Sequence, residues 1–332
     1  MKKFRLLLLF LLVACLATAG WLYRDWQGLM TSPLIEDGQV VLWLPAGSSF
    51  GSLGRQLETL DLGQRDWRWQ LYGRLQQPHL RAGEYLLEGP LSLPELVAVL
   101  ERGQVRRHRF TVVEGWTLAR LRQSLASDPR LRQLTTDWDE ARLMAELGCD
   151  GCFGEGRFLP ETYFFVRPDS DLDLLRRAHQ ALNDQLQAVW QSRAPGLPLQ
   201  TAEELLVLAS IIERETGQAG ERAKVAGVFR RRLEIGMRLQ TDPTVIYGMG
   251  EDFDGRLLRV HLRQDHPWNT YTRHGLPPTP IALPGRASLQ AAGHPADGSS
   301  LYFVARGDGS HHFSDTLAEH NAAVNRYIRG RR

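Results

Sequence analysis

Two glutamates follow a strongly apolar, helix-forming run, where a carboxyl group could act in acid/base chemistry. The run covers residues 205–212, and Glu213 and Glu215 come directly after it. Burial penalises the charged form of a carboxyl and raises its pKa, which lets it hold a proton near neutral pH as a general acid must. Residues two apart on a helix point about 200° away from each other, so the two glutamates cannot share one cleft. The periodicity does not choose between them, and ion pairing of both with Arg214 or Arg222 is the alternative.

The elements around this run predict a rigid helix beside long loops. Residues 171–192 have helical periodicity, and the Pro- and Gly-containing stretch 194–198 breaks it. Thr201 then caps the apolar helix, with Glu204 three residues on in a capping-box arrangement. From position 236 the chain is rich in Gly, Pro, Thr, Asn and Tyr, with short strands such as residues 301–305. Loops of this kind often carry the specific groups of a site that a rigid element supports.

The first half of the chain contains a repeated pattern of short strands and helices. Ser49, Ser92 and Thr117 each precede apolar residues at helical spacing and are predicted N-caps. Strand-like runs lie nearby at 40–44, 82–87 and 110–113. We expect residues 38–105 to form a compact module that resembles LysM modules, which bind the sugars of cell-wall polymers. A spacer domain that merely packs is the alternative.

The N-terminus predicts a membrane anchor. Lys2, Lys3 and Arg5 precede an uncharged stretch, residues 6–23, which would span about 27 Å as a helix, close to the thickness of a hydrocarbon core. Positive charge before the span places a short tail, residues 1–5, in the cytoplasm and the bulk of the chain outside. A cleaved signal peptide and a lipoprotein with Cys15 at its cleavage site are the alternatives. All three export the rest of the chain.

Composition and charge limit the other functions. With 332 residues, an apolar share of 43% and a charged share of 23%, the chain is long enough for two globular domains. The net charge of +2 argues against a nucleic-acid partner, and we interpret the basic clusters, among them residues 230–232, as solvated faces. Cys149 and Cys152 are better placed for a local disulfide than for zinc, and the histidines do not have metal-ligand spacing, so no metal is expected.

A set of motifs gives the chain a specific resemblance. It resembles the MltG (YceG-like) family of endolytic murein transglycosylases over nearly its whole length, from the single N-terminal span and the LysM-like module onward. Departures are Thr279, where relatives often carry Gly, and the Cys149/Cys152 pair. The matching stretches are Phe158-Leu159-Pro160-Glu161-Thr162-Tyr163, Glu213-x-Glu215-Thr216, Arg238 to Gly248, Asn269-Thr270-Tyr271, Gly275-Leu276-Pro277-Pro278, Ile281-Ala282, Pro284-Gly285, residues 291–295 and His320-Asn321.

The resemblance implies a fold, a site and a reaction. The fold is α+β: an N-terminal transmembrane helix, a small LysM-like module, a connecting strand–helix region at 106–147, and a larger mixed catalytic domain at 148–332. The second glutamate of the motif, Glu215, is implied as the acid/base of a lyase that cleaves the MurNAc–GlcNAc β-1,4 bond and leaves 1,6-anhydro ends. No cofactor is implied. The residues we expect to contact sugar are Gln240, Thr241, Asp242, Tyr247, Asn269 and Tyr271.

The implied setting is the bacterial inner membrane, with the bulk of the chain in the periplasm. Glycan strands are the expected partner, with peptidoglycan synthases (penicillin-binding proteins) beside them and strand termination as the role. Two other functions remain open. One is a hydrolytic muramidase that pairs Glu215 with Asp242 or Glu161, since ordinary glycosidases need two carboxyl groups. The other is a wall-binding scaffold without catalysis.

Overall fold

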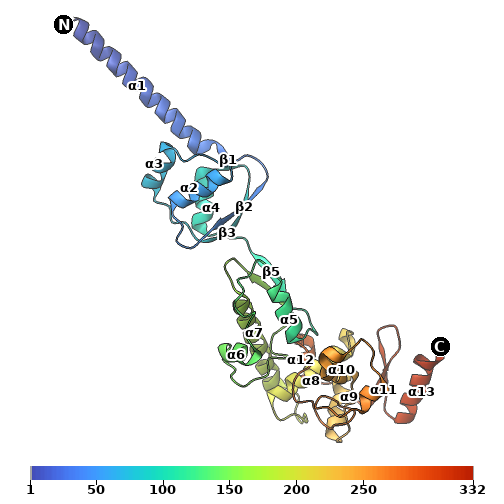
Figure 1. The fold of residues 1–332 in the computed structure, drawn as a ribbon. Helices are drawn as coiled ribbons and strands as arrows, with labels where there is room; N and C mark the ends of the chain where they lie inside the picture. The colour runs from blue at the N-terminus through green and yellow to red at the C-terminus, as the bar shows by residue number, and fades with distance from the viewer. Residues whose placement is uncertain (1, 332) are drawn as a thin grey trace. The chain divides into compact units, whose positions relative to one another are not determined.

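The structure is a computed structural model that describes residues 2–331, and it divides into two compact units (Figure 1). The first unit ends at His108 and also takes in Val166–Pro168. The second takes in Arg109–Phe165 and the chain from Asp169 onward. Both units mix helices with short two-stranded sheets, so the predicted α+β class is confirmed.

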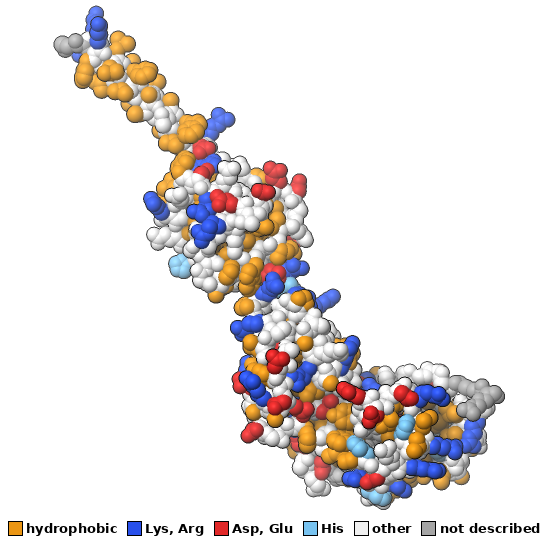
Figure 2. Space-filling model, in the orientation of Figure 1, with side chains coloured by type: hydrophobic (Ala, Val, Ile, Leu, Met, Phe, Trp, Pro, Cys, Tyr) orange, Lys and Arg blue, Asp and Glu red, His pale blue; other side chains and the backbone are white. Residues whose placement is uncertain are grey.

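The chain begins with the long helix α1 (Lys2–Thr31). The helix is apolar and long enough to cross a membrane, and none of its residues is buried. Figure 2 shows hydrophobic side chains covering it. The helix extends past both ends of the predicted span at 6–23, because the polar residues that follow Tyr23 continue the same helix. It is a candidate single membrane anchor.

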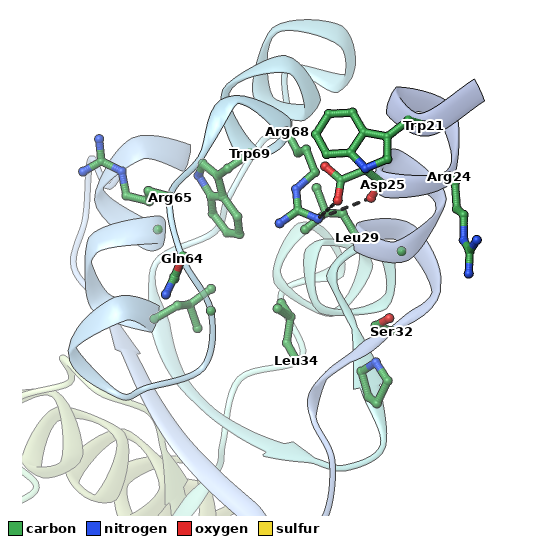
Figure 3. Close-up of a pocket in the computed structure, with 15 residues that line it drawn as sticks. Trp21, Arg24, Asp25, Leu29, Ser32, Leu34, Gln64, Arg65, Arg68 and Trp69 are labelled. Carbon is green, nitrogen blue, oxygen red and sulfur yellow. Dashed lines mark hydrogen bonds and ion pairs between the residues drawn. The ribbon is translucent and has the colours of Figure 1, made fainter. Parts of the chain in front are cut away.

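The last turns of α1 pack against the rest of the first unit. Leu29 and Met30 contact its core, and Asp25 forms an ion pair with Arg68 at 3.0 Å. Between α1 and the helix that carries Arg68 lies a cavity of about 510 Å³, drawn in Figure 3. The C-terminal end of α1 is therefore packed against the first unit.

The first unit alternates short strands with helices, as predicted. Strands β2 (Gln39–Leu44) and β3 (Gly83–Glu88) pair antiparallel with Leu42 opposite Tyr85, and β1 (Pro33–Ile35) pairs with β4 (Leu91–Ser92). Helices α2 (Phe50–Thr59), α3 (Trp67–Gln76) and α4 (Leu93–Arg102) complete the unit. The predicted caps are confirmed: Ser49 accepts from the Ser52 amide, and Ser92 forms a capping box with Glu95.

The second unit contains the remaining elements, and its helices α7, α8, α9 and α12 pack on one another. Its elements are β5 (His108–Thr111), α5 (Leu118–Ala126), α6 (Glu140–Glu146), β6 (Thr162–Phe165), α7 (Asp171–Ser192), α8 (Ala202–Glu215), α9 (Arg222–Glu234), α10 (Asp242–Met249), α11 (Arg259–Arg263), α12 (Arg286–Gly293), β7 (Tyr302–Ala305), β8 (His311–Ser314) and α13 (Leu317–Tyr327), with short 3-10 turns at Ala219–Glu221, Gly250–Asp252 and Arg329–Arg331.

The expected connecting region at 106–147 is not a separate segment. Phe110 and Leu121 from this region share a hydrophobic core with Phe158 and Leu175. Most of it therefore belongs to the second unit, whose boundary falls after residue 108 and not after 147. The predicted disulfide between Cys149 and Cys152 is present.

Candidate functional site

Helix α8 carries the two glutamates and is as buried as its sequence requires. All residues from Leu205 to Ile212 are buried. Thr201 caps the helix by accepting from the Glu204 amide at 3.2 Å, as predicted. The Glu204 carboxylate, however, accepts from the Gln200 amide, so the reciprocal bond of a capping box is absent from this pair. A helix enclosed in this way holds its last residue in a fixed position.

The two glutamates differ sharply in their surroundings. Glu213 is only 5% exposed, accepts from the Gly285 amide at 2.9 Å and lies 3.7 Å from the Arg222 guanidinium. Its carboxylate is thus occupied by structural contacts. Glu215, the last residue of α8, instead lines a cavity of about 320 Å³. The structure therefore separates a pair that periodicity left undecided.

The Glu215 carboxyl is held by a neutral donor in a largely dry setting. The Thr241 hydroxyl donates to its Oε1. Burial raises the pKa of Glu215 above its ordinary value, and the Asp242 charge adds to the rise. The Thr241 hydroxyl, His311 and Arg232 act in the opposite direction. Burial is the largest of these effects, so the protonated form of this carboxyl is favoured over that of an ordinary glutamate, as a general acid requires.

A group of buried threonines fixes the donor. Thr241 is the N-cap residue of α10, and its amide donates to the Thr270 hydroxyl at 3.1 Å. Thr244 bonds both to the Thr241 carbonyl at 2.8 Å and to the Thr270 hydroxyl at 2.9 Å. Gln240 precedes this group with a left-handed backbone, φ 48°, and its backbone amide donates to the Thr270 carbonyl. The loop around residue 270 therefore sets the position of α10 against Glu215.

The other walls of the cavity offer hydrogen-bonding groups and ring faces. Tyr271 donates its hydroxyl to Asp242 at 2.5 Å, and burial together with this carboxylate raises the pKa of Tyr271. The His320 ring stacks on Tyr302 at 5.2 Å between centroids, and its Nδ1 is buried without a hydrogen-bond partner among the described residues. Burial and the Arg232 charge lower the pKa of His320, which favours the neutral form of the ring. Amide, hydroxyl, carboxylate and ring faces at one cavity suit a polyhydroxylated ligand.

Comparison with known proteins identifies the family of the chain. The model of the YceG-like family matches residues 42–326. The chain belongs to the YceG-like family. A protein named endolytic murein transglycosylase from Bacillus subtilis is 31% identical over 86% of this chain and 84% of its own length. One of the same name from Streptococcus pneumoniae is 25% identical over 96% of this chain and 64% of its own.

A solved structure from the YceG-like family extends the comparison to the fold. The crystal structure of a yceG-like protein from Listeria monocytogenes superimposes with a TM-score of 0.54 and 28% identity, over 87% of this chain and 100% of the other. The architecture described above is therefore that of the family.

Four of the six residues expected to contact sugar lie at the Glu215 cavity. Gln240, Asp242 and Tyr271 line it, and Thr241 is bonded to Glu215. Tyr247 lines a different cavity, because it lies on the opposite end of α10.

Asn269 does not contribute a side chain to either cavity. It is 1% exposed, and its amide nitrogen donates to backbone carbonyls of the loop before it, at 2.7 Å for Gln264. Its Oδ1 accepts from the Tyr271 amide at 2.9 Å. Asn269 thus holds the loop that carries Tyr271, and we remove it and Tyr247 from the residues proposed to contact sugar beside Glu215.

One of the six residues that line the Glu215 cavity and were not predicted as site residues corrects a prediction; the six are Arg232, Leu239, Tyr302, Phe303, Leu317 and His320. Arg232 belongs to the basic run that we interpreted as a solvated face, yet it is 7% exposed. Its guanidinium donates to the carbonyls of Leu239 and Leu301 at 2.6 and 2.7 Å. These acceptors are brought in by tertiary packing, which no local pattern shows. Tyr302 lies in the strand predicted at 301–305 and His320 in the His320-Asn321 motif, but neither was predicted to line the site.

Within residues 2–331, no group of three or more His, Cys, Asp or Glu side chains is arranged to hold a metal ion. Glu161, the other carboxyl considered for a two-carboxylate mechanism, is paired with Arg286 at 3.0 Å and is not among the residues that line the Glu215 cavity. Asp242 does line it.

Proposed function

We propose that this chain is an endolytic murein transglycosylase that cuts MurNAc–GlcNAc β-1,4 bonds within glycan strands, with Glu215 as its acid/base. The observation that carries the proposal is the Glu215 carboxyl, which ends a buried helix, opens into a polar cavity and has a raised pKa. The names of the Bacillus and Streptococcus relatives support it.

The reaction needs one carboxyl and no added water. Protonated Glu215 donates its proton to the glycosidic oxygen as the bond from that oxygen to the MurNAc C1 breaks. The resulting carboxylate then takes the proton of the MurNAc C6 hydroxyl, whose oxygen bonds to C1. The products are a GlcNAc hydroxyl end and a 1,6-anhydro-MurNAc end, and Glu215 is protonated again. Because the nucleophile belongs to the substrate, no second protein carboxylate has to lie opposite Glu215.

The other residues of the Glu215 cavity suit two roles: they position the carboxyl and the substrate, and they stabilise the charge on Glu215. Thr241 holds the carboxyl in place through its hydroxyl, and the Arg232 charge stabilises the carboxylate form once the proton has left. Gln240, Asp242 and Tyr271 present hydrogen-bonding groups to sugar hydroxyls and N-acetyl groups. Preorganised groups of this sort lower the barrier because they need not rearrange during the reaction.

The cellular setting forms part of the proposal. Helix α1 anchors the chain in the inner membrane with Lys2, Lys3 and Arg5 on the cytoplasmic side, and both compact units lie in the periplasm. The first unit acts as a LysM-like module that binds glycan, which its alternating strands and helices support. The enzyme works on nascent strands beside peptidoglycan synthases and terminates their elongation.

The test is the mass of the new strand ends. Purified full-length protein in detergent is incubated with glycan strands, and the fragments are analysed by mass spectrometry. We expect anhydro ends, one water lighter than hydrolysed ends, and we expect Glu215→Gln to abolish them. Glu161→Gln is the control variant and should cut normally, since its exposed carboxyl is paired with Arg286.

One alternative has a specific observation in its favour. Asp242 lies at the same cavity as Glu215, as the second carboxylate of a hydrolytic muramidase would. That enzyme would leave ends that contain the added water, so the same measurement separates the two. A wall-binding scaffold without catalysis would release no fragments with either the parent chain or the Glu215→Gln variant.

A further inference from the structure

The second unit has a larger cavity that the proposed reaction does not use. It measures about 770 Å³, within the range of pockets that enclose small ligands. Helices α5, α6 and α10 contribute to its walls, together with the loops around residues 153–155, 266–268 and 279–281. Its lining includes Ala119, Phe153, Glu155, Tyr247 and Trp268.

One wall is formed by aromatic rings in contact with one another. Trp268 packs against the rings of Tyr247 at 5.9 Å and of His266 at 5.3 Å between centroids. The indole Nε1–H donates to the Thr279 hydroxyl at 2.9 Å, which fixes the orientation of the ring. Phe153, also in the lining, is 59% exposed. A large exposed apolar side chain at the lining of a cavity offers surface for a ligand to cover.

A buried carboxyl lies beside these rings. Glu155 is 7% exposed and accepts from neutral donors: the Leu118 amide at 3.1 Å, the Gly156 amide at 3.2 Å and the Tyr247 hydroxyl at 3.4 Å. Burial raises the pKa of Glu155 to about 7, with the nearby charge of Glu140 adding to the rise. A carboxyl in this state can both accept hydrogen bonds from hydroxyls and, when protonated, donate one.

The charges of the lining are close to balanced and mostly engaged. Arg122 donates to the carbonyls of Thr135 and Trp138, and Arg214 donates to the Gly115 carbonyl. On the acidic side, Glu140 accepts from the Gly154 amide. A site for a polyanion would present several unengaged cations. This lining suits a ligand that carries hydroxyl and amide groups and little net charge.

Two elements connect this cavity to the Glu215 cavity. At the start of α10, Thr241 and Asp242 face Glu215, while Ile246 and Tyr247 further along the helix line the larger cavity. At the end of α8, Glu215 lines one cavity and its neighbour Arg214 lines the other. The two cavities therefore share α10 and the end of α8 in their walls.

We propose that the larger cavity is a carbohydrate subsite that holds sugar units of the glycan strand distant from the bond being cut, with the Tyr247 and Trp268 rings packing on sugar faces and Glu155 bonding to hydroxyls. The proposal rests on the proposed function, because the ligand is the same strand. Such a subsite makes the enzyme select glycan chains of several sugars, as cleavage within a strand requires.

The test blocks the cavity from an exposed position. Ala119 lies on the surface of α5 and also lines the cavity, so an indole in Ala119→Trp would fill the space without disturbing the core. The matched control is Ala126→Trp, an exposed alanine on the same helix that does not line this cavity. Phe153→Ala is the second test variant, since it removes an exposed ring of the lining. All three are made in the full-length Glu215→Gln chain so that ligands stay intact.

Binding is measured by calorimetry with peptide-free oligosaccharides of alternating GlcNAc and MurNAc. Ala119→Trp and Phe153→Ala should weaken octasaccharide binding about tenfold or more. Binding of the tetrasaccharide should stay unchanged, and Ala126→Trp should match the parent with both ligands. Equal binding of both ligands by Ala119→Trp and by the parent overturns the proposal.

Two further outcomes are distinguishable from this one. If Ala119→Trp weakens binding only of strands that carry stem peptides, the cavity takes peptide, and the sugar assignment is wrong. If the wild-type chain cuts glycan to anhydro ends while the cavity variants bind normally, the subsite fails and the proposed function stands. Failure of the wild-type chain to bind or cut any glycan rejects the proposed function itself.

Discussion

Replacing each glutamate of α8 by glutamine should separate a structural carboxylate from a catalytic one. Glu213→Gln keeps an oxygen that can accept from the Gly285 amide but removes the charge facing Arg222. Glu215→Gln keeps an acceptor for the Thr241 hydroxyl but removes the proton that the reaction needs. Both side chains belong to the same helix end, so the two variants control for each other.

The magnitudes follow from the contacts. Removing one partner of a buried ion pair costs about 3–5 kcal/mol. The loss is smaller here because Arg222 keeps Glu114 at 3.8 Å, and that carboxylate is half exposed and screened by water. We therefore expect Glu213→Gln to lower the free energy of unfolding by about 2 kcal/mol. At about 2–4 °C per kcal/mol for a unit of this size, its Tm should fall by about 4–8 °C.

Glu215→Gln should show the opposite pattern. Burial opposes the ionised form of Glu215 more than the His311 and Arg232 charges favour it, so a neutral amide should leave the Tm unchanged or higher. Cleavage should fall by about 10²–10⁴-fold, the usual contribution of general acid/base catalysis.

The assay combines calorimetric unfolding of the full chain in detergent with mass-spectrometric counting of anhydro ends. Cleavage is measured well below the lower Tm, where Glu213→Gln should retain activity within a few fold. The reasoning is refuted if Glu213→Gln has the parent Tm and loses cleavage as completely as Glu215→Gln.

Three further predictions concern other parts of the chain. Burial raises the pKa of Glu155 to about 7 in the folded protein, against 4.5 in the unfolded chain, so its carboxyl resists ionisation only in the folded state as pH rises. The parent should therefore lose about 3 kcal/mol of stability relative to Glu155→Gln between about pH 4 and pH 8. Denaturant titrations that show no such pH dependence would reject the burial argument. The disulfide between Cys149 and Cys152 closes a short loop, with a sequence separation of three. Replacing both cysteines by serine should therefore lower the free energy of unfolding by only about 2 kcal/mol, measured by thermal unfolding, and leave strand cleavage intact. Loss of cleavage in the folded variant would show a functional role for the disulfide. Replacing residues 2–23 by a cleavable export signal should move the protein from the membrane fraction to the soluble periplasmic extract. Retention in the membrane fraction would contradict α1 as the anchor.

The sequence predicts those features that local patterns encode. The apolar run of α8 requires burial, and the helices of the first unit that follow Ser49 and Ser92 begin where these caps predict. The choice of Glu215 over Glu213 came from the family motif and stays a prediction. The structure adds a difference between the two side chains, because of the two glutamates Glu213 is the one that contacts Arg222 and the Gly285 amide.

Features that depend on packing between distant segments were not predictable. Arg232 can be buried because the carbonyls of Leu239 and Leu301 accept hydrogen bonds from its guanidinium. The local run of three arginines contains no sign of these distant acceptors. Glu155 lies between two glycines in a loop, and only the approach of Tyr247 and the start of α5 makes it a buried carboxyl. Asn269 has the residue type of a sugar contact but serves the backbone of its own loop.

The left-handed backbone of Gln240 has a consequence for engineering. A residue with a side chain at φ 48° costs of order 1 kcal/mol relative to glycine, which adopts this conformation freely. Selection for thermostability alone should therefore enrich glycine at position 240, while selection for wall turnover should restore the amide that reaches the Glu215 cavity. Directed evolution under the two regimes would diverge at this position.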